Sequence, residues 1–162
     1  MMPANSDIHA SQPPNRRRCR EIMTRNVVAA NPAMTLQQIA ALMRDGDMGA
    51  LPVTDDAGKL VGIITDRDIV VRAAADGRDL TQTTVAEIMT PETHTTRPDD
   101  FVFQAIRLMR DKQVRRVPVI DDERVLQGIL SMADIALEME DEREIAEALE
   151  DISSGTAFWR KN

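Results

Sequence analysis

Aromatic residues, cysteine and histidine are scarce in this sequence. Its 162 residues include three Phe, one Trp, no Tyr, one Cys and two His. The single cysteine, Cys19, excludes a disulfide within the chain, and two histidines are too few for a zinc cluster of the usual kind. We therefore expect no structural metal, and no cofactor is required by any motif.

Long apolar runs are absent as well. No stretch of about 18 apolar residues occurs, and residues 1–20 are polar without the apolar segment of a secretory signal. We therefore expect a cytoplasmic protein with no membrane partner. The formal charge of −7 argues against general binding of nucleic acid, which needs a clustered basic face.

The dominant positive feature is an internal repeat. Residues 21–69 align with residues 87–135 without a gap, at a step of 66 residues, and 19 of the 49 pairs are identical. The matched strings are EIMT, LMRD, a Pro-Val pair, an Asp-Asp pair, a Gly-Ile pair and an Asp-Ile pair. Identity at a fixed step over this length indicates a tandem duplication.

Each copy predicts the order β-α-β-β-α, which makes the fold α/β (α+β). In the first copy the elements are a strand at 27–30, a helix at 35–45, strands at 50–53 and 60–64, and a helix from Thr65. Gly46 is expected at the C-cap of the first helix. A half of this size is marginal alone, so we expect the two repeats to pack sheet to sheet with pseudo-twofold symmetry and two clefts between them.

The domain boundaries follow from the repeat. We expect four segments: a disordered tail at 1–18, a first domain at 19–80, a second at 81–140, and a helical extension with a tail at 141–162. The helix after Ser131 is predicted to continue to about Ile152, with an apolar stripe that needs either the protein body or a second protomer. The stripe comprises Ile135, Met139, Glu142, Ile145, Ala146, Leu149 and Ile152. Phe158 and Trp159 are then expected to form either a disordered end or an anchor for a dimer or another partner.

The most informative repeated segment is Gly-x-x-[Ser/Thr]-x-x-Asp. It occurs at 62–68 and at 128–134, where a strand is predicted to end and a helix to begin. One interpretation is structural, since a hydroxyl followed three residues later by a carboxylate resembles a capping box. The other is a ligand site, in which the aspartate binds ribose hydroxyls and the glycine leaves room for the ligand. The two interpretations are compatible.

These segments, with GALPV and RRVPV, resemble a tandem pair of CBS (cystathionine β-synthase) domains over residues 19–140. The sequence is most similar to small bacterial stand-alone CBS-pair proteins, the hypoxic response protein type among them. The resemblance implies adenosine-containing ligands in the clefts, homodimers, and no catalysis. It also implies a role for each matched pair of residues. Asp68 and Asp134 would bind ribose, Thr65 and Ser131 would contact phosphate, and Ile63 and Ile129 would line the adenine pocket.

The charges around the motif are not duplicated. Arg67 precedes the first aspartate, where the second copy has an alanine, and either binds phosphate or is a solvated side chain. Arg115 and Arg116 stand where the first copy has Gly-Ala; in the family, basic residues there can reach phosphates. Their alternative is ion pairing with Asp111, Asp121 or Asp122. We therefore expect two clefts of unequal affinity.

The resulting hypothesis is a non-enzymatic module that binds an adenosyl nucleotide, such as AMP, ADP, ATP or S-adenosylmethionine, and relays its level to a regulated protein. The alternative is a ligand-free, constitutive dimerisation or protein-interaction module. An enzyme is disfavoured, because no nucleophile, base and orienting group occur together in a motif.

Overall fold

The computed structural model describes residues 16–138 and 142–154. The predicted disorder before residue 16 and the interpretation of Phe158 and Trp159 fall outside these ranges. Arg17 and Arg18, which we had assigned to the tail, are already bonded to the body: the Arg17 carbonyl accepts from Val102 N at 2.9 Å, and Arg18 forms a β-bridge with Phe101. None of the helices within the described residues combines the length and the apolar character needed to cross a bilayer.

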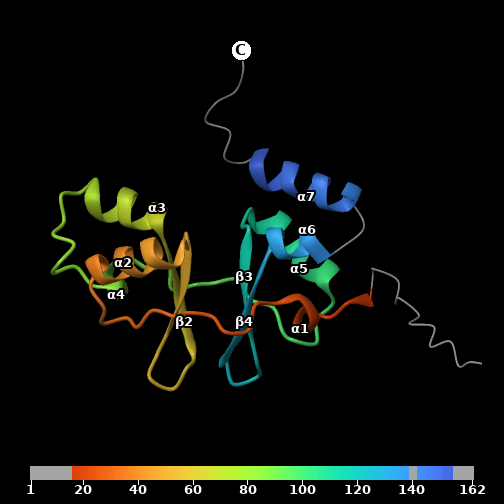
Figure 1. Cartoon of the computed structure of the whole chain (residues 1–162), viewed down its shortest axis with the longest axis horizontal. Helices are drawn as coiled ribbons and strands as arrows, with labels where there is room; N and C mark the ends of the chain where they lie inside the picture. The colour runs from red at the N-terminus through yellow and green to blue at the C-terminus, as the bar shows by residue number, and fades with distance from the viewer. Residues whose placement is uncertain (1–15, 139–141, 155–162) are drawn as a thin grey trace, which may run out of the picture.

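The first repeat builds one hairpin flanked by helices (Figure 1). Its elements are α2 (Leu36–Gly46), β1 (Ala50–Thr54), β2 (Leu60–Thr65), α3 (Asp66–Asp68) and the π-helical turn η2 (Ile69–Ala74). Helix α2 begins where Thr35 and Gln38 form a capping box. It ends at Gly46, and the following residue, Asp47, is the C-cap with a left-handed φ of 51°, so the expectation that Gly46 is the C-cap is wrong.

The second repeat builds the same unit. Its elements are α5 (Val102–Lys112), β3 (Arg116–Ile120), β4 (Leu126–Ser131) and α6 (Met132–Glu138). The two antiparallel hairpins have the same register: Ala50 lies opposite Thr65 in the first, and Arg116 lies opposite Ser131 in the second. The predicted fold class, two repeats related by pseudo-twofold symmetry, is confirmed.

The first strand of each repeat is smaller than predicted. The segment 27–30 contributes one parallel bridge, between Ala30 and Val53, and the equivalent bridge in the second repeat joins Thr96 to Val119. Each sheet therefore has two strands. The chain here is pinned by hydrogen bonds on either side of a strand residue, such as Ala30 N to Pro52 O at 2.8 Å, without a continuous ladder.

The two repeats exchange their leading segments. Helix α1 (Cys19–Ile22) precedes the first repeat in sequence but lies beside β4 and α6, whereas α4 (Val85–Ile88) lies beside η2 (Figure 1). Accordingly, Cys19 and Ile22 belong to the buried cluster of the second repeat, and Val85 and Ile88 to that of the first. This crossing ties the halves together and was not predicted from the sequence.

The two sheets also meet at their hairpin ends. Leu60 N donates to Arg124 O at 3.0 Å, and Leu126 N donates to Gly58 O at 3.1 Å. Gly58 has a φ of +77°, as the tight turn after β1 requires. These bonds hold the two hairpins next to each other, so that side chains of both sheets line the space between them.

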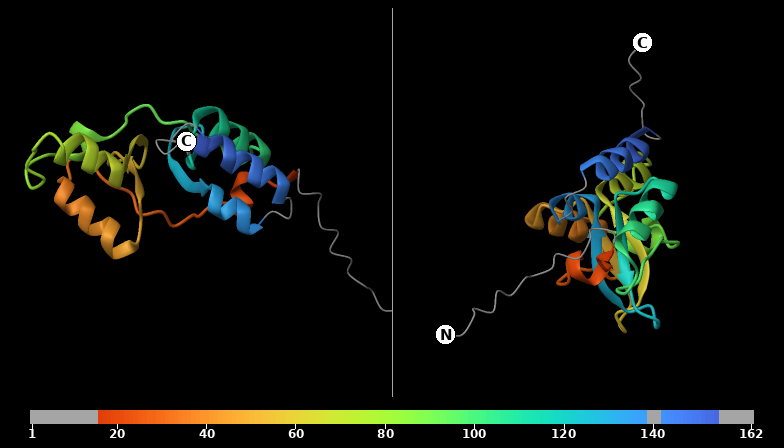
Figure 2. Two further views of the ribbon diagram at one scale, coloured as in Figure 1. Left: turned by 90° about the horizontal axis from the view of Figure 1, so that it is seen from above. Right: turned by 90° about the vertical axis from the view of Figure 1, so that its right-hand side faces the viewer.

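The expected long C-terminal helix is two helices, α6 and α7 (Glu142–Ser154), with residues 139–141 outside the described ranges. Helix α7 packs against α5 on the outer side of the second repeat (Figures 1 and 2). Ile145, Ala148 and Ile152 are buried there, so the protein body is the partner of the apolar stripe. Leu149, which we had placed on the stripe, is 38% exposed.

Candidate functional site

Two clefts open between the sheets at positions related by the 66-residue step. We call the first cleft A; its volume is about 400 Å³, within the usual range for small-molecule pockets. It is lined by Thr24, residues 26–28 and 47–51, and by Arg116, Ile129, Ser131 and Asp134. The predicted site residues of the second repeat therefore face a wall supplied by the first.

The second cleft, cleft B, is its pseudo-twofold equivalent, with a volume of about 260 Å³. It is lined by Ile63, Thr65, Asp68, Thr90, residues 92–94, Val114, Arg116 and Pro118. Cleft B is thus the smaller of the two. Its wall also differs: Glu92, Thr93 and His94 stand where cleft A has an asparagine and two valines.

A capping box closes the strand-to-helix turn beside each cleft. Thr65 N and Oγ1 donate to Asp68 Oδ2 at 2.9 and 2.8 Å, and Asp68 N donates to Thr65 Oγ1 at 3.1 Å. Ser131 and Asp134 repeat the arrangement at 3.1, 2.6 and 3.1 Å. The capping interpretation of the motif is confirmed, and ligand binding by the same residues stays a prediction.

The second oxygen of each aspartate distinguishes the clefts. In cleft B, Asp68 Oδ1 lies 3.5 Å from Arg72 Nε. The residue equivalent to Arg72 is Glu138, which pairs with Arg17 at 3.4 Å. As a result, Asp134 Oδ1 in cleft A has no hydrogen bond or ion pair to any described residue and is free to accept one from a ligand.

The two motif glycines, Gly62 and Gly128, lie against the backbone of the exchanged segments and not against a cleft. A Cβ atom on Gly62 would lie 2.9 Å from Thr90 O, and one on Gly128 would lie 2.6 Å from Thr24 O. Backbone hydrogen bonds at this contact join Ile63 to Thr90 and repeat in the second half. The glycines therefore admit the exchanged segment, and the expectation that they leave room for a ligand is wrong.

The three predicted arginines are all exposed, but they differ in position. Arg116 lines both clefts, whereas Arg67 and Arg115 do not line either one. Arg115 Nη2 donates to Ser153 Oγ at 3.4 Å, which directs it to α7. Neither Arg115 nor Arg116 pairs with Asp111, Asp121 or Asp122, so the ion-pair alternative is wrong within the described residues.

Sequence reasoning placed His94, which aligns with Val28, near a cleft and missed the rest of the cleft walls at 24–28 and 90–94. We had interpreted the first of these segments as the start of a strand, and only the exchange of leading segments brings it opposite the other repeat. One atom in this wall is unusual: Thr93 Oγ1 is buried and has no hydrogen-bond partner in the described part of the chain. The 66-residue step pairs Thr24 with Thr90, but it does not say which repeat each of these segments joins.

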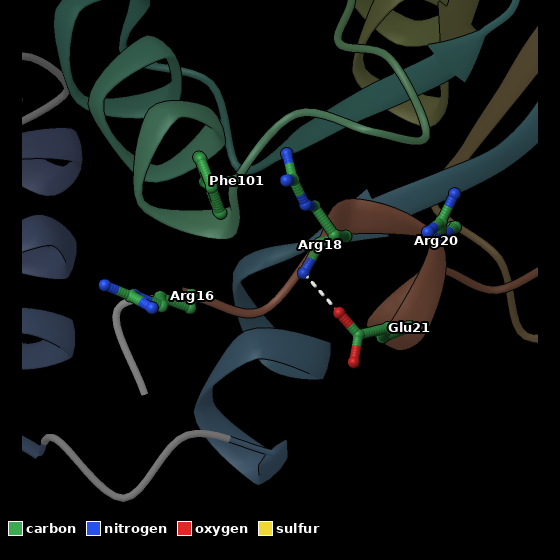
Figure 3. Close-up of a pocket in the computed structure, with 5 residues that line it drawn as sticks. All are labelled: Arg16, Arg18, Arg20, Glu21 and Phe101. Carbon is green, nitrogen blue, oxygen red and sulfur yellow. Dashed lines mark hydrogen bonds between the residues drawn. The ribbon is translucent and has the colours of Figure 1, made fainter. Parts of the chain in front are cut away.

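A larger cavity of about 680 Å³ lies at the N-terminal segment (Figure 3). It is lined by Arg16, Arg18, Arg20, Glu21 and Phe101. Two of its three cations have partners: the Arg18 guanidinium lies 3.9 Å from the centroid of the Phe101 ring, and Arg20 pairs with Asp99. Figure 3 shows the three guanidinium groups lying apart from one another, with Arg16 on one side of Phe101 and Arg18 and Arg20 on the other.

Metal and thiol chemistry have little support in the described residues. No group of three or more His, Cys, Asp or Glu side chains that could hold a metal ion occurs within 16–138 and 142–154. Cys19 is fully buried, and burial raises the pKa of its thiol from 9.0 to about 11. A neutral, inaccessible thiol packs as a small apolar side chain.

A duplicated unit that encloses two equivalent clefts defines a paired-repeat domain. A sequence profile described as "CBS domain" matches residues 19–74 and 85–141. The chain therefore belongs to the CBS domain family, as its resemblance had predicted.

Two curated relatives cover most of the chain. The CBS domain-containing protein YhcV of Bacillus subtilis is 37% identical over 134 residues, which cover 83% of this chain and 94% of YhcV. Hypoxic response protein 1 of Mycobacterium tuberculosis is 38% identical over 117 residues, which cover 72% of this chain and 81% of that protein. The predicted similarity to the hypoxic response protein type is confirmed.

Solved structures of other CBS domain pairs have the same fold as this chain. The crystal structure of hypoxic response protein I with two coordinated zinc ions has a TM-score of 0.70 at 36% identity, covering 76% of this chain and 99% of that one. The CBS domain pair of protein MJ0100, in complex with 5′-methylthioadenosine and S-adenosyl-L-methionine, has a TM-score of 0.68 at 30% identity. It covers 75% of this chain and 94% of that chain.

Proposed function

We propose that this protein is a non-enzymatic regulatory module that binds an adenosine-containing ligand between its two CBS repeats, with cleft A as the stronger site. The observation that carries the proposal is the carboxylate of Asp134, which lines a cleft of about 400 Å³ with one oxygen uncommitted. The related MJ0100 domain pair, crystallised with two adenosyl compounds, supports this class of ligand.

The lining of cleft A suits each part of such a ligand. Asp134 Oδ1 can accept hydrogen bonds from ribose hydroxyls while Oδ2 remains in the capping box. Ile129 and the two valines at 27–28 offer apolar contact to an adenine ring. Arg116 can form charge-assisted hydrogen bonds to phosphate oxygens, and Ser131 is placed to assist it.

Cleft B has the same arrangement of motif residues as cleft A, but its volume and its charges are less favourable to a phosphorylated ligand. Asp68 is partly neutralised by Arg72, the cleft volume is about 260 Å³, and Glu92 adds a negative charge to the wall. Ile63 and Thr65 take the positions of Ile129 and Ser131. We therefore expect weaker binding in cleft B, above all for ligands with several phosphates. Arg67 and Arg115 lie outside the clefts, so they can contact phosphate only in a ligand whose polyphosphate chain extends beyond the cleft.

The test is a thermal-shift series with AMP, ADP, ATP, S-adenosylmethionine and NAD. A ligand at 100 times its Kd adds about 2.7 kcal/mol to the free energy of unfolding, which raises the melting temperature by several degrees. The Asp134→Ala variant should lose most of the shift. Glu87→Ala is the matched control, because it removes the capping box of α4 outside both clefts and should keep the shift.

The outcome decides between two functions. A shift that Asp134→Ala abolishes and Glu87→Ala retains supports a ligand-responsive module. If none of the five compounds produces a shift, the proposal is wrong and the ligand-free interaction module takes its place.

We also propose a homodimer, a cytoplasmic location and a regulated protein partner that responds to the ligand. Val70, Val71 and Leu137 are exposed apolar side chains on the last helical segments of the two repeats, and they support the dimer surface. Paired Val71→Glu and Leu137→Glu substitutions should convert the dimer to a monomer in analytical ultracentrifugation. An unchanged sedimentation coefficient would exclude this surface.

A further inference from the structure

Arg116 differs from its pseudo-twofold equivalent in a way that joins the two clefts. It opens β3 and lies directly opposite Ser131 on β4, just as Ala50 opens β1 and lies opposite Thr65. Residues directly opposite in an antiparallel pair have Cβ atoms roughly 4.5–5.5 Å apart. The backbone of Arg116 therefore lies beside the motif of cleft A. The pseudo-twofold symmetry places the same residue in the wall of cleft B, because its equivalent, Ala50, lies in the wall of cleft A.

The length of this side chain makes it common to both clefts. Arg116 lines cleft A together with Ser131 and Asp134, and it lines cleft B together with Thr65 and Asp68. Ala50, which has the equivalent position, lines cleft A alone. One repeat thus supplies a cation at the boundary between the clefts, and the other supplies a methyl group.

Arg116 is also uncommitted. Its side chain is exposed and makes no hydrogen bond or ion pair with the described residues. Among the described residues that line the clefts, it is the sole arginine or lysine, and it faces carboxylates on both sides. These are Asp47 and Asp134 in cleft A and Asp68 and Glu92 in cleft B, with His94 beside the latter pair.

We infer that the two clefts compete for one arginine, so that a phosphorylated ligand in one cleft weakens the binding of a phosphorylated ligand in the other. This inference rests on the proposed function. A guanidinium engaged by the phosphate of one ligand cannot neutralise a second phosphate, which then faces the local carboxylates unaided. An adenosyl ligand without phosphate does not need the Arg116 guanidinium, so a ligand in the other cleft does not weaken its binding.

Competition for Arg116 favours one combination of ligands in the two clefts. The favoured doubly occupied state holds one phosphorylated nucleotide and one adenosyl compound without phosphate, and two phosphorylated nucleotides are disfavoured. The protein would then respond to the ratio of the two ligand classes and not to the sum of their concentrations.

Isothermal titration calorimetry of the full chain with AMP and with adenosine tests this coupling. Asp68→Ala disables cleft B and leaves cleft A intact, whereas Asp134→Ala disables cleft A and leaves cleft B intact. Each variant should therefore bind one AMP. In the unmodified protein the second AMP should bind at least about fivefold more weakly than in the matching single-cleft variant, at the lower end of typical coupling between sites. Two adenosine molecules should bind without this penalty.

Arg116→Gln should lower the AMP affinity of both clefts and reduce the penalty to less than about twofold. Arg115→Gln is the matched control, because this neighbouring arginine contacts Ser153 and lines neither cleft, and its penalty should equal that of the unmodified protein. Circular dichroism verifies that each variant is folded, and Asp→Asn variants replace any Asp→Ala variant that is not.

The possible failures are distinguishable. Absence of binding by both AMP and adenosine would overturn the proposed function and this inference with it. Two AMP molecules bound at their single-cleft affinities, or one single-cleft variant that does not bind AMP, would overturn the inference alone and leave an adenosyl-binding module.

Discussion

The two repeats have the same backbone and different charges. Their hairpins match in register residue by residue, and both motif aspartates cap the following helix in the same way. By contrast, Arg72 in the first repeat is Glu138 in the second, and Ala50 in the first is Arg116 in the second. The duplicated residues therefore maintain the fold, whereas the residues that diverged set the chemistry of each cleft.

The second repeat also carries a helix on its outer face, and removing that contact should give the largest effect. Ile152 on α7 is 2% exposed within the core of this repeat. Ile152→Ala should lower the free energy of unfolding by about 2–5 kcal/mol, as measured by urea denaturation. Leu149→Ala, one turn earlier and 38% exposed, should cost less than about 1 kcal/mol. Equal losses would mean that α7 is not part of the core.

The motif glycines offer the next largest effect, with a difference between halves. Gly128→Ala and Gly62→Ala should each destabilise the fold by about 1–3 kcal/mol, because the new methyl group meets the backbone of the exchanged segment. The loss should be greater at Gly128, where the contact is 2.6 Å against 2.9 Å. Gly49→Ala, whose nearest neighbour is at 3.5 Å, is the control and should stay within about 0.5 kcal/mol.

Equivalent positions in the two cores differ in their response to pH. Cys19 matches Val85, and its thiol pKa is raised to about 11 by burial. The folded state therefore retains a proton that the unfolded chain releases above pH 9.0, so stability is complete below pH 9 and falls as pH rises toward 11. The loss should be about 1.4 kcal/mol per pH unit.

Cys19→Val isolates this contribution, because it installs the residue of the other repeat. Chemical denaturation at pH 8, 9, 10 and 11 should show a shallower decline for the variant. Parallel declines for the two proteins would exclude the thiol as the titrating group.

The smallest effect concerns the walls of the clefts. Thr93 in cleft B has a buried hydroxyl without a partner in the described part of the chain, and cleft A has Val27 at the equivalent position. Thr93→Val should raise the free energy of unfolding by about 1 kcal/mol, because an unsatisfied buried hydroxyl is removed. Val27→Thr should lower it by a similar amount or less. If Thr93→Val destabilises the protein in thermal melts, its hydroxyl has a partner after all.

Much of the fold was predictable because the duplication repeats local signals. The turn at Gly58, the capping residues Thr65 and Asp68, and the two hairpins all follow from residues close together in sequence. The first strand failed as a prediction because Ala30 makes one bridge, and its partners lie more than twenty residues away. Local composition does not encode how far such a ladder extends.

The site was predictable in its motif and not in its walls. Ile129, Ser131 and Asp134 line cleft A as expected from their shared segment. The roles of the glycines and the shared position of Arg116 depend on which chain segment crosses to which repeat, and a repeat alignment does not contain that information. Arg115 was equally unpredictable, because its contact, Ser153, lies on a helix that folds back from the end of the described chain.

The exchange of leading segments has a consequence for synthesis of the protein. Thr24 pairs with Ile129, so the segment that carries α1 needs a strand that is synthesised more than a hundred residues later. At translation speeds of roughly 5–20 residues per second, α1 waits on the order of ten seconds for its partner. During that interval the apolar side chains of Ile22 and Met23 are available to chaperones, and the finished second repeat then has to bind a segment that was synthesised before the first repeat.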